Sequence, residues 1–254
     1  MNLKNQLTPF VLSFIVLFAL FSGMGFLLSN IDWTSAKILI CVVTVCGVIM
    51  AWSMIKRVPP TQSFLEVGFG IPKWRVVGVA VVISALMLAF FPLYSSLERV
   101  NLVLQSHWVW ILIGIITGVG IAEETLFRGF VFNYFRERFA FWRAATYSMF
   151  LFGAMHLLLL LWLPLPIAIA AILLAIIAAY PTAYLFEQGN RTIWASAIMH
   201  SAALATNLFV IPQVISVALS LVWIGVVLIG LFLVFLAGRL FFTNQTAQLK
   251  LQNT

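Results

Sequence analysis

The chain has 254 residues, of which 63% are apolar and only 8% are Asp, Glu, Lys or Arg. Soluble domains are about 25% charged, so this composition excludes a soluble globular protein, and it excludes a disordered chain as well. The net charge of +7 comes from basic residues scattered between apolar runs, a distribution that predicts membrane topology and no binding to nucleic acid.

A helix needs about 20 apolar residues to cross the hydrocarbon core of a bilayer, and runs of that length fill most of the sequence. Prolines in the Leu163-Pro164-Leu165-Pro166 segment separate two of the runs, because proline discourages helix continuation. We therefore predict an all-α, polytopic membrane protein that forms a single integral membrane domain over residues 1–254. The eight expected transmembrane helices cover residues 8–29, 35–55, 76–97, 108–133, 143–163, 165–186, 192–211 and 214–237.

Basic side chains predict the orientation of these helices. An even number of helices puts both termini on one side, together with the even-numbered connections. That side carries Lys4, Lys56, Arg57, Lys73, Arg75, Arg136, Arg138, Arg143, Arg191, Arg239 and Lys250, whereas the opposite side carries Lys37 and Arg99. The asymmetry predicts a multi-pass protein of the cell membrane with both termini in the cytoplasm, where the basic residues contact anionic lipid head groups.

Ionisable residues inside the apolar runs are unexpected, because each costs about 2.5 to 3.5 kcal/mol near the middle of a bilayer. Glu123, Glu124 and Arg128 lie in the fourth run, His156 lies in the fifth and His200 in the seventh. Glu124 and Arg128 are four residues apart on one helical face, where they can form an ion pair. Glu123 is rotated by about 100° from that pair and remains free to meet another helix.

Depth in the membrane distinguishes two interpretations of these residues. One is a buried ion-pair network with packed histidines and no chemistry. The other is a shared site. Counted from the nearest cytoplasmic arginine at about 1.5 Å per residue, Glu123, His156 and His200 lie roughly 20, 20 and 14 Å deep. This agreement between three helices favours the shared site.

A glutamate and two imidazoles at one level can catalyse hydrolysis in two ways. Glu123 can take a proton from a bound water while His156 orients that water and His200 donates a hydrogen bond to the developing oxyanion. Alternatively, Glu123, His156 and His200 can ligate a zinc ion, since two His and one Glu with water form a known catalytic set. The sequence leaves the zinc and the metal-free mechanism open.

The pattern resembles the CAAX prenyl protease and bacteriocin-processing family of intramembrane proteases, also called the CPBP or Abi family. Its signature is E-E-x-x-x-R in one span, F-x-x-x-H in the next, and H-x-x-x-N or H-x-x-x-D in a later one. The matching residues are Glu123, Glu124, Arg128, Phe152, His156 and His200, within a predicted motif core of residues 108–211.

This resemblance implies a CAAX-protease-like core of eight helices with an interior cavity reached from the cytoplasm and the bilayer. Glu123 would be the water-activating base, His156 its assistant and His200 part of the oxyanion hole, with Glu124, Arg128 and Phe152 in support. The third motif departs from the family pattern, because Leu204 stands where Asn or Asp is expected. Asn207, seven residues after His200, would return to the same helical face and is a candidate substitute. Loss of one oxyanion donor lowers rates by about 100-fold to 1,000-fold.

The function that these features predict is an intramembrane peptidase, of glutamic or metalloprotease type, that hydrolyses a peptide bond of a membrane-associated or lipidated peptide. The alternative is a non-catalytic membrane immunity or scaffold protein, as in bacteriocin immunity, that binds a peptide in the same cavity. A proton-coupled transporter is a third class, since intramembrane Glu and His also form proton relays. Replacing Glu123 by Gln would abolish hydrolysis and leave binding intact.

Overall fold

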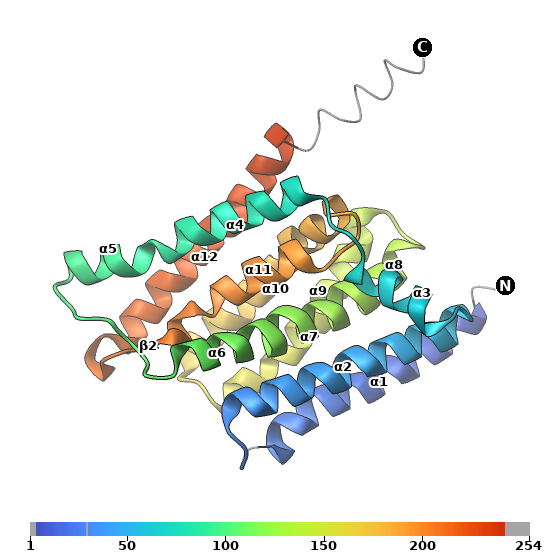
Figure 1. Cartoon of the computed structure of the whole chain (residues 1–254), viewed down its shortest axis with the longest axis horizontal. Coiled ribbons are helices and arrows are strands. Elements are labelled where there is room, and N and C mark those ends of the chain that lie inside the picture. The colour runs from blue at the N-terminus through green and yellow to red at the C-terminus, as the bar shows by residue number, and fades with distance from the viewer. Residues whose placement is uncertain (1–3, 29, 242–254) are drawn as a thin grey trace.

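The computed structural model describes residues 4–28 and 30–241 and forms one elongated bundle of helices (Figure 1). Lys250, one of the basic residues used to predict orientation, lies outside the described residues. Within the described part, seven helical stretches are long and apolar enough to cross a membrane. They are Gln6–Leu27, Trp33–Lys56, Trp74–Leu97, Trp108–Arg136, Phe141–Leu161, Leu165–Gln188 and Gln213–Phe241. The protein is therefore a multi-pass, all-α membrane protein, as the sequence predicts.

Several of these stretches consist of more than one element, because π-helical segments (η1 to η3) and 3₁₀ turns (η4 and η5) interrupt the α-helices. The elements are α1 (Lys4–Leu27), α2 (Trp33–Lys56), α3 (Pro60–Phe64), η1 (Leu65–Phe69), α4 (Trp74–Leu88), α5 (Phe90–Leu97), β1 (Val103–Leu104), α6 (Trp108–Gly114), η2 (Ile115–Ile121), α7 (Ala122–Glu124), η3 (Thr125–Phe132), α8 (Asn133–Arg136), α9 (Phe141–His156), η4 (Leu157–Leu161), α10 (Leu165–Gln188), α11 (Trp194–Ala203), η5 (Ala205–Leu208), β2 (Phe209–Val210) and α12 (Gln213–Phe241).

The predicted seventh transmembrane helix, over residues 192–211, differs from the expectation. Its helix α11 has only 10 residues, and the chain then continues through η5 to β2, which pairs antiparallel with β1. The free carbonyls at the end of α11 are satisfied from elsewhere: the Trp223 indole donates to the Ala203 oxygen (2.7 Å) and the Asn207 amide donates to the Leu204 oxygen (3.0 Å). The count of eight is therefore approximate, with seven long helices and a shorter, partly non-helical eighth segment.

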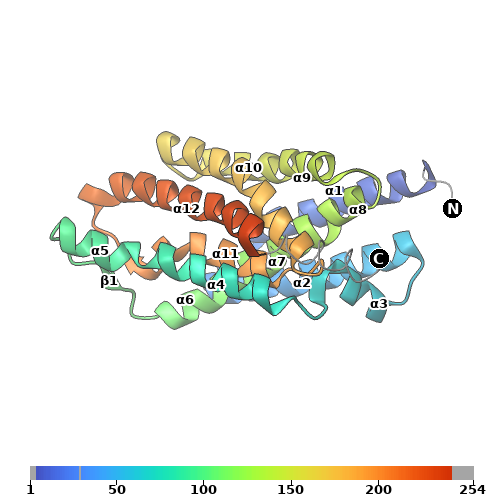
Figure 2. The same cartoon turned by 90° about the horizontal axis from the view of Figure 1, so that it is seen from above.

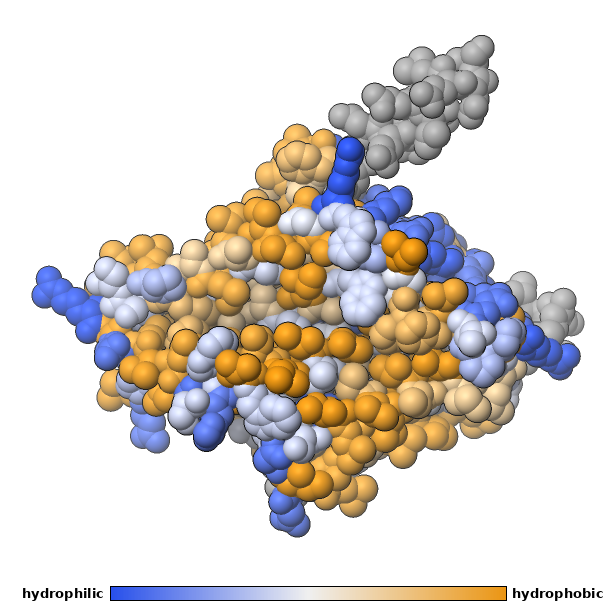
Figure 3. All heavy atoms as spheres, viewed as in Figure 1, coloured by the Kyte–Doolittle hydropathy of each residue, from blue (hydrophilic) through white to orange (hydrophobic). Residues whose placement is uncertain are grey.

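The elements α7 and α11 lie in the middle of the bundle. Figure 2 shows them between one row of helices that includes α9, α10 and α12 and another that includes α4 and α6. Much of the molecular surface in Figure 3 is apolar, and the strongly hydrophilic residues lie mainly at its margins. This distribution suits a bundle whose sides contact lipid and whose few buried polar groups are kept in its interior.

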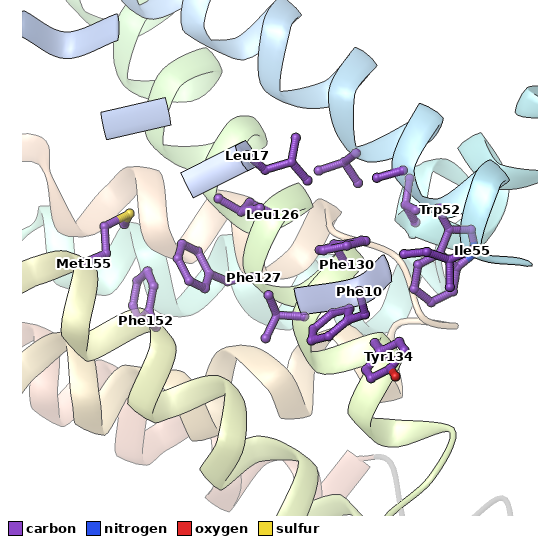
Figure 4. Packing of buried hydrophobic residues seen from close by; sticks show 14 of the residues in the cluster. Phe10, Leu17, Trp52, Ile55, Leu126, Phe127, Phe130, Tyr134, Phe152 and Met155 are labelled. Atoms are coloured by element: carbon purple, nitrogen blue, oxygen red, sulfur yellow. The ribbon is translucent and has the colours of Figure 1, made fainter. Parts of the chain in front are cut away.

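An aromatic cluster packs beside the central helix. Phe10 of α1 stacks on Tyr134 with ring centroids 3.7 Å apart, and Phe127 meets Phe152 edge-on at 4.8 Å (Figure 4). All four side chains are 2% exposed or less. Since Phe127 lies on η3 and Phe152 on α9, this packing fixes the fourth crossing against the fifth.

Two side-chain contacts at the start of α2 fix it to α6. Asp32 caps α2 by accepting from the Ser35 amide (3.0 Å), and it also accepts from the Trp110 indole (3.1 Å). These hydrogen bonds hold the pKa of the Asp32 carboxyl below its usual value. Thr34 donates to the Trp110 carbonyl at 3.0 Å. As a result, α2 lies along η2 over the following turns.

The segment η1, which follows α3, packs against both η3 and the start of α11. Gly68 has φ 109°, a conformation that favours glycine, and its carbonyl accepts from the Ile193 amide at 3.0 Å just before α11. On the other side, Gly129 of η3 lies directly against the backbone of Val67. These contacts of η1 therefore fix the start of α11 relative to η3.

We expect Gly129→Ala to destabilise the protein, because the added Cβ would collide with the Val67 carbonyl oxygen, a backbone atom that cannot rotate away. Overpacking of this kind costs about 1 to 3 kcal/mol. The measurement is thermal unfolding of the purified protein in detergent. Gly78→Ala in α4 is the matched control, since its Cβ would meet nothing within 4 Å. Equal transition temperatures for the two variants would contradict the expectation.

Candidate active site

The two adjacent glutamates lie on α7, a single α-helical turn between the π-helical segments η2 and η3. Such π-helical insertions occur frequently at functional sites. Gly120, at the end of η2, faces α11 so closely that a Cβ there would overlap the Ser201 hydroxyl and lie 3.1 Å from the Ala197 carbonyl. This close approach brings His200 of α11 next to the glutamates.

Glu124 is fully buried and has two charged or polar partners. Its Oε2 lies 3.3 Å from Arg128 Nε, which confirms the predicted ion pair. Its Oε1 lies 2.8 Å from His200 Nδ1. Arg128, 1% exposed, also donates from Nε to the Thr182 hydroxyl of α10 at 3.0 Å. Neither the His200 contact nor the role of Thr182 was predicted from the sequence, where the signal for Thr182 is a hydroxyl in an otherwise apolar run.

Glu123 has a different environment, as its rotation from Glu124 predicts. Its Oε2 lies 3.8 Å from His200 Nε2 and forms no hydrogen bond with any residue that the structure describes. The side chain is only 10% exposed. The His200 ring therefore lies between two carboxylates, with Nδ1 toward Glu124 and Nε2 toward Glu123.

His156 is held by its own helix. Its Nδ1 lies 2.9 Å from the Phe152 carbonyl oxygen. The Phe152 ring contacts both imidazoles edge-on, with centroids 4.5 Å from His156 and 5.8 Å from His200. Arg128 packs its guanidinium 4.5 Å from the same ring centroid. Phe152 therefore contacts Arg128, which the sequence predicts to support the site, and both imidazoles, which it predicts to be catalytic. The ring helps to orient all three side chains.

These groups surround one cavity of about 680 Å³. Glu123, His156 and His200 all line it, as do Arg128 and Phe152, so the three predicted catalytic side chains share one space. Its walls are otherwise mainly apolar side chains of α10 and α12, among them Ile167, Leu174, Ile224, Val227 and Leu231. Such a lining, with a few convergent polar groups, is typical of a ligand site.

Asn207 lines the same cavity but not in the predicted way. Because α11 ends at Ala203, Asn207 does not lie two turns along the same helical face as His200. Its amide donates to the Leu204 carbonyl, and its own carbonyl accepts from Gln105 at 2.9 Å. The predicted position of Asn207 on the helical face of His200 is therefore wrong, and the role of Asn207 as an oxyanion donor stays a prediction.

The suggested zinc ligands do not form a metal-binding group. Among the described residues, no three His, Cys, Asp or Glu side chains are arranged to hold an ion. Glu123, His156 and His200 share the cavity, and because His200 Nδ1 contacts Glu124 and His156 Nδ1 contacts a carbonyl, the Nε2 atoms are the nitrogens left to bind an ion. Zinc ligation stays a prediction that an experiment with chelator tests.

The arrangement is that of a multi-pass membrane protein with a carboxylate and imidazole cluster inside an apolar cavity. Residues 105–206 match the family of type II CAAX prenyl endopeptidases described as Rce1-like. The matched segment covers less than half of the chain but contains every residue of the three motifs, and this confirms the resemblance that the motifs predict. No curated protein and no solved structure matches the chain.

Proposed function

We propose that this protein is an intramembrane endopeptidase that hydrolyses a peptide bond of a membrane-associated or lipidated polypeptide. One observation carries the proposal: Glu123 lines the cavity, and its buried Oε2 lacks a hydrogen-bond partner among the described residues and lies 3.8 Å from His200 Nε2. The endopeptidase description of the matching family supports the same reaction. Apolar cavity walls suit apolar side chains or a lipid chain of the substrate.

The hydrogen bonds of the two histidines assign their protons. A carbonyl oxygen only accepts, so His156 Nδ1 donates to Phe152, and a neutral His156 has the lone pair on Nε2. His200 Nδ1 donates to the carboxylate of Glu124. When His200 is doubly protonated, its Nε2 also donates, toward the space that Glu123 faces.

Hydrolysis then follows from these roles. A water in the cavity gives one proton to the Glu123 carboxylate and one hydrogen bond to His156 Nε2, and its oxygen attacks the carbonyl carbon of the substrate. The negative charge on the carbonyl oxygen is stabilised by His200 Nε2–H. The tetrahedral intermediate collapses as the C–N bond breaks and Glu123 returns its proton to the leaving amine.

The ion pair between Glu124 and Arg128 positions His200. Glu124 accepts a hydrogen bond from His200 and forms an ion pair with Arg128, so its charge is compensated while it fixes the orientation of the imidazole. We infer that Glu124 and Arg128 act through His200 and do not contact the substrate. Both termini are proposed to lie in the cytoplasm of the cell, and the membrane to be the cell membrane, from the distribution of basic residues.

The proposal is tested by incubating the purified protein in detergent with a peptide library and identifying new termini by mass spectrometry. Wild type is compared with Glu123→Gln and His156→Ala, each with and without chelator. We expect cleavage by the wild type that both substitutions reduce, and the chelator arm distinguishes the metal-free type from the metalloprotease type. Equal cleavage by all three proteins would refute the proposed roles, and loss of activity with chelator, restored by zinc, would favour the metalloprotease type. An immunity or scaffold protein would bind peptides and cleave none.

A further inference from the structure

The two ends of the bundle differ in how they meet the cavity. One end, here called the terminal end, contains the start of α1 and the end of α12, and Arg136 pairs with Glu187 there. The opposite end, here called the far end, contains β1, β2 and the turn between η4 and α10, and there Gln105 donates to the Asn207 carbonyl at 2.9 Å. Figure 1 shows the start of α1 at the right and β2 at the left.

The cavity extends from the glutamates to the far end. Its lining on α10 runs from Ile167 to Thr182, a distance of 15 residues or about 22 Å along the helix. Leu163 and Asn207, which lie in the connections at the far end, also line the cavity, and both side chains are exposed. The cavity is therefore open to the surroundings at the far end.

Packed side chains close the way from the glutamates to the terminal end. Beyond Thr182, the next turn of α10 contributes Ala183 and Phe186 to a cluster of fully buried side chains that includes Phe132 and Ile193. The rings of Phe132 and Phe186 meet edge-on, with centroids 5.9 Å apart. This cluster lies between η3, α10 and the start of α11, so a substrate that entered here would have to displace close-packed side chains.

The depth of the glutamates sets the length of chain that must enter from the far end. Glu124 lies one helical turn from Arg128 in the direction of the far end, and Ala178 lies one turn in the same direction from Thr182, the partner of Arg128. Ala178 is therefore near the level of the glutamates, eleven residues or about 16 Å from Ile167. Since an extended peptide advances about 3.3 Å per residue, about five residues bridge this distance.

We propose that the substrate enters the cavity at the far end, as an extended segment of a polypeptide on that face of the membrane. This inference rests on the proposed function, because it takes Glu123 as the residue that activates water at the scissile bond. With the orientation that the basic residues predict, the far end faces away from the cytoplasm. The substrate class is then an exported or membrane-anchored polypeptide, whereas the family resemblance alone implies entry from the cytoplasm and the bilayer.

The test modifies each end of the bundle separately. A cysteine is introduced by Leu163→Cys at the far end or by Lys73→Cys at the terminal end, in protein that also carries Cys41→Ala and Cys46→Ala. Lys73 directly precedes α4, is exposed and lies outside the lining that the described residues form. Each protein is reconstituted in both orientations in sealed phosphatidylcholine vesicles. The best-cleaved peptide of the library assay, in a charged form that does not cross the bilayer, is added outside.

A bulky maleimide that does not cross the bilayer is then added outside as well. It reaches the thiol of Leu163→Cys only in molecules whose far end faces outward, and these are the molecules that we expect to cleave the external peptide. Modification of Leu163→Cys should therefore abolish cleavage relative to the same protein before modification, and modification of Lys73→Cys should leave the rate unchanged. Loss of cleavage with modified Lys73→Cys, or no loss with modified Leu163→Cys, would overturn the proposal.

The length of the entering segment gives a second measurement on unmodified protein. A folded carrier attached about two residues from the scissile bond should prevent cleavage, whereas about ten residues between them should permit it, because about five residues span the entrance. Equal cleavage of both fusions would contradict the depth of the site below the far end.

A binding measurement applies even if the wild type hydrolyses no peptide. Each cysteine substitution is combined with Glu123→Gln, and the rate of modification by the maleimide is measured with and without the peptide library outside. Bound peptide should slow modification of the Leu163→Cys thiol and leave that of the Lys73→Cys thiol unchanged. This result without hydrolysis by the wild type would refute the proposed hydrolysis alone. Protection of the Lys73→Cys thiol, or no protection of the Leu163→Cys thiol, would overturn entry from the far end.

Discussion

Replacing Glu123 by Gln should lower the rate of peptide hydrolysis by about 100-fold to 10,000-fold, the usual contribution of a general base. The amide has nearly the same size as the carboxylate but cannot take a proton from water. The fold should persist, because among the described residues Glu123 has an ion-pair contact only with His200, and Arg128 remains paired with Glu124. The measurement is kcat for the best-cleaved peptide, with thermal unfolding as the check on folding.

Glu98→Gln is the matched control for this experiment. Glu98 is exposed at the end of α5 and does not line the cavity, so the same chemical change there should leave kcat within about twofold. A Glu123→Gln protein that retains more than a tenth of wild-type activity would exclude Glu123 as the base. Peptide binding should be similar in both variants, since the cavity walls are unchanged.

Some features of the site follow directly from residue spacing. The pairing of Glu124 with Arg128 depends only on two side chains one helical turn apart, and it survives although η3 is π-helical. The shared depth of Glu123, His156 and His200 likewise follows from counting residues along three spans. Local geometry was therefore sufficient to place these three side chains in one cavity.

Contacts that depend on how neighbouring helices rotate could not be predicted in this way. His200 contacts Glu124 as well as Glu123 because Gly120 allows α11 to approach closely. No pattern in the sequence specifies how α11 is rotated about its axis. Thr182 meets Arg128 across two helices for the same reason. A single sequence predicts how deep a residue lies in the membrane more readily than it predicts the direction in which its side chain points around the helix axis.

The seventh span was mispredicted for another reason. Apolar composition does not distinguish a long helix from a short helix followed by a 3₁₀ turn and a strand. At the end of α11 the indole of Trp223, twenty residues away on α12, donates to the Ala203 carbonyl. Since such a long-range contact leaves no local signal, the position of Asn207 was inferred on a helix that had already ended.

The second large effect is expected at Arg128. Arg128→Met keeps a long side chain but removes the charge that compensates Glu124, and both residues are at most 1% exposed. Breaking a buried ion pair by removing one partner costs about 3 to 5 kcal/mol, because an uncompensated charge is left inside. We expect a correspondingly lower free energy of unfolding, measured by denaturant titration in detergent, together with a loss of hydrolysis as His200 loses its fixed acceptor.

Arg136→Met is the control for the loss of an arginine from the same span. Arg136 pairs with Glu187 at 2.7 Å, but these side chains are 32% and 23% exposed, so the cost should stay within about 1 kcal/mol.

The double variant Glu124→Gln, Arg128→Met should recover much of the lost stability, because neither charge is then left alone. It should not recover hydrolysis, since a neutral amide at position 124 holds the imidazole less firmly than the carboxylate does. If the double variant is as unstable as Arg128→Met, packing of the guanidinium on Phe152 and Thr182, and not its charge, explains the loss.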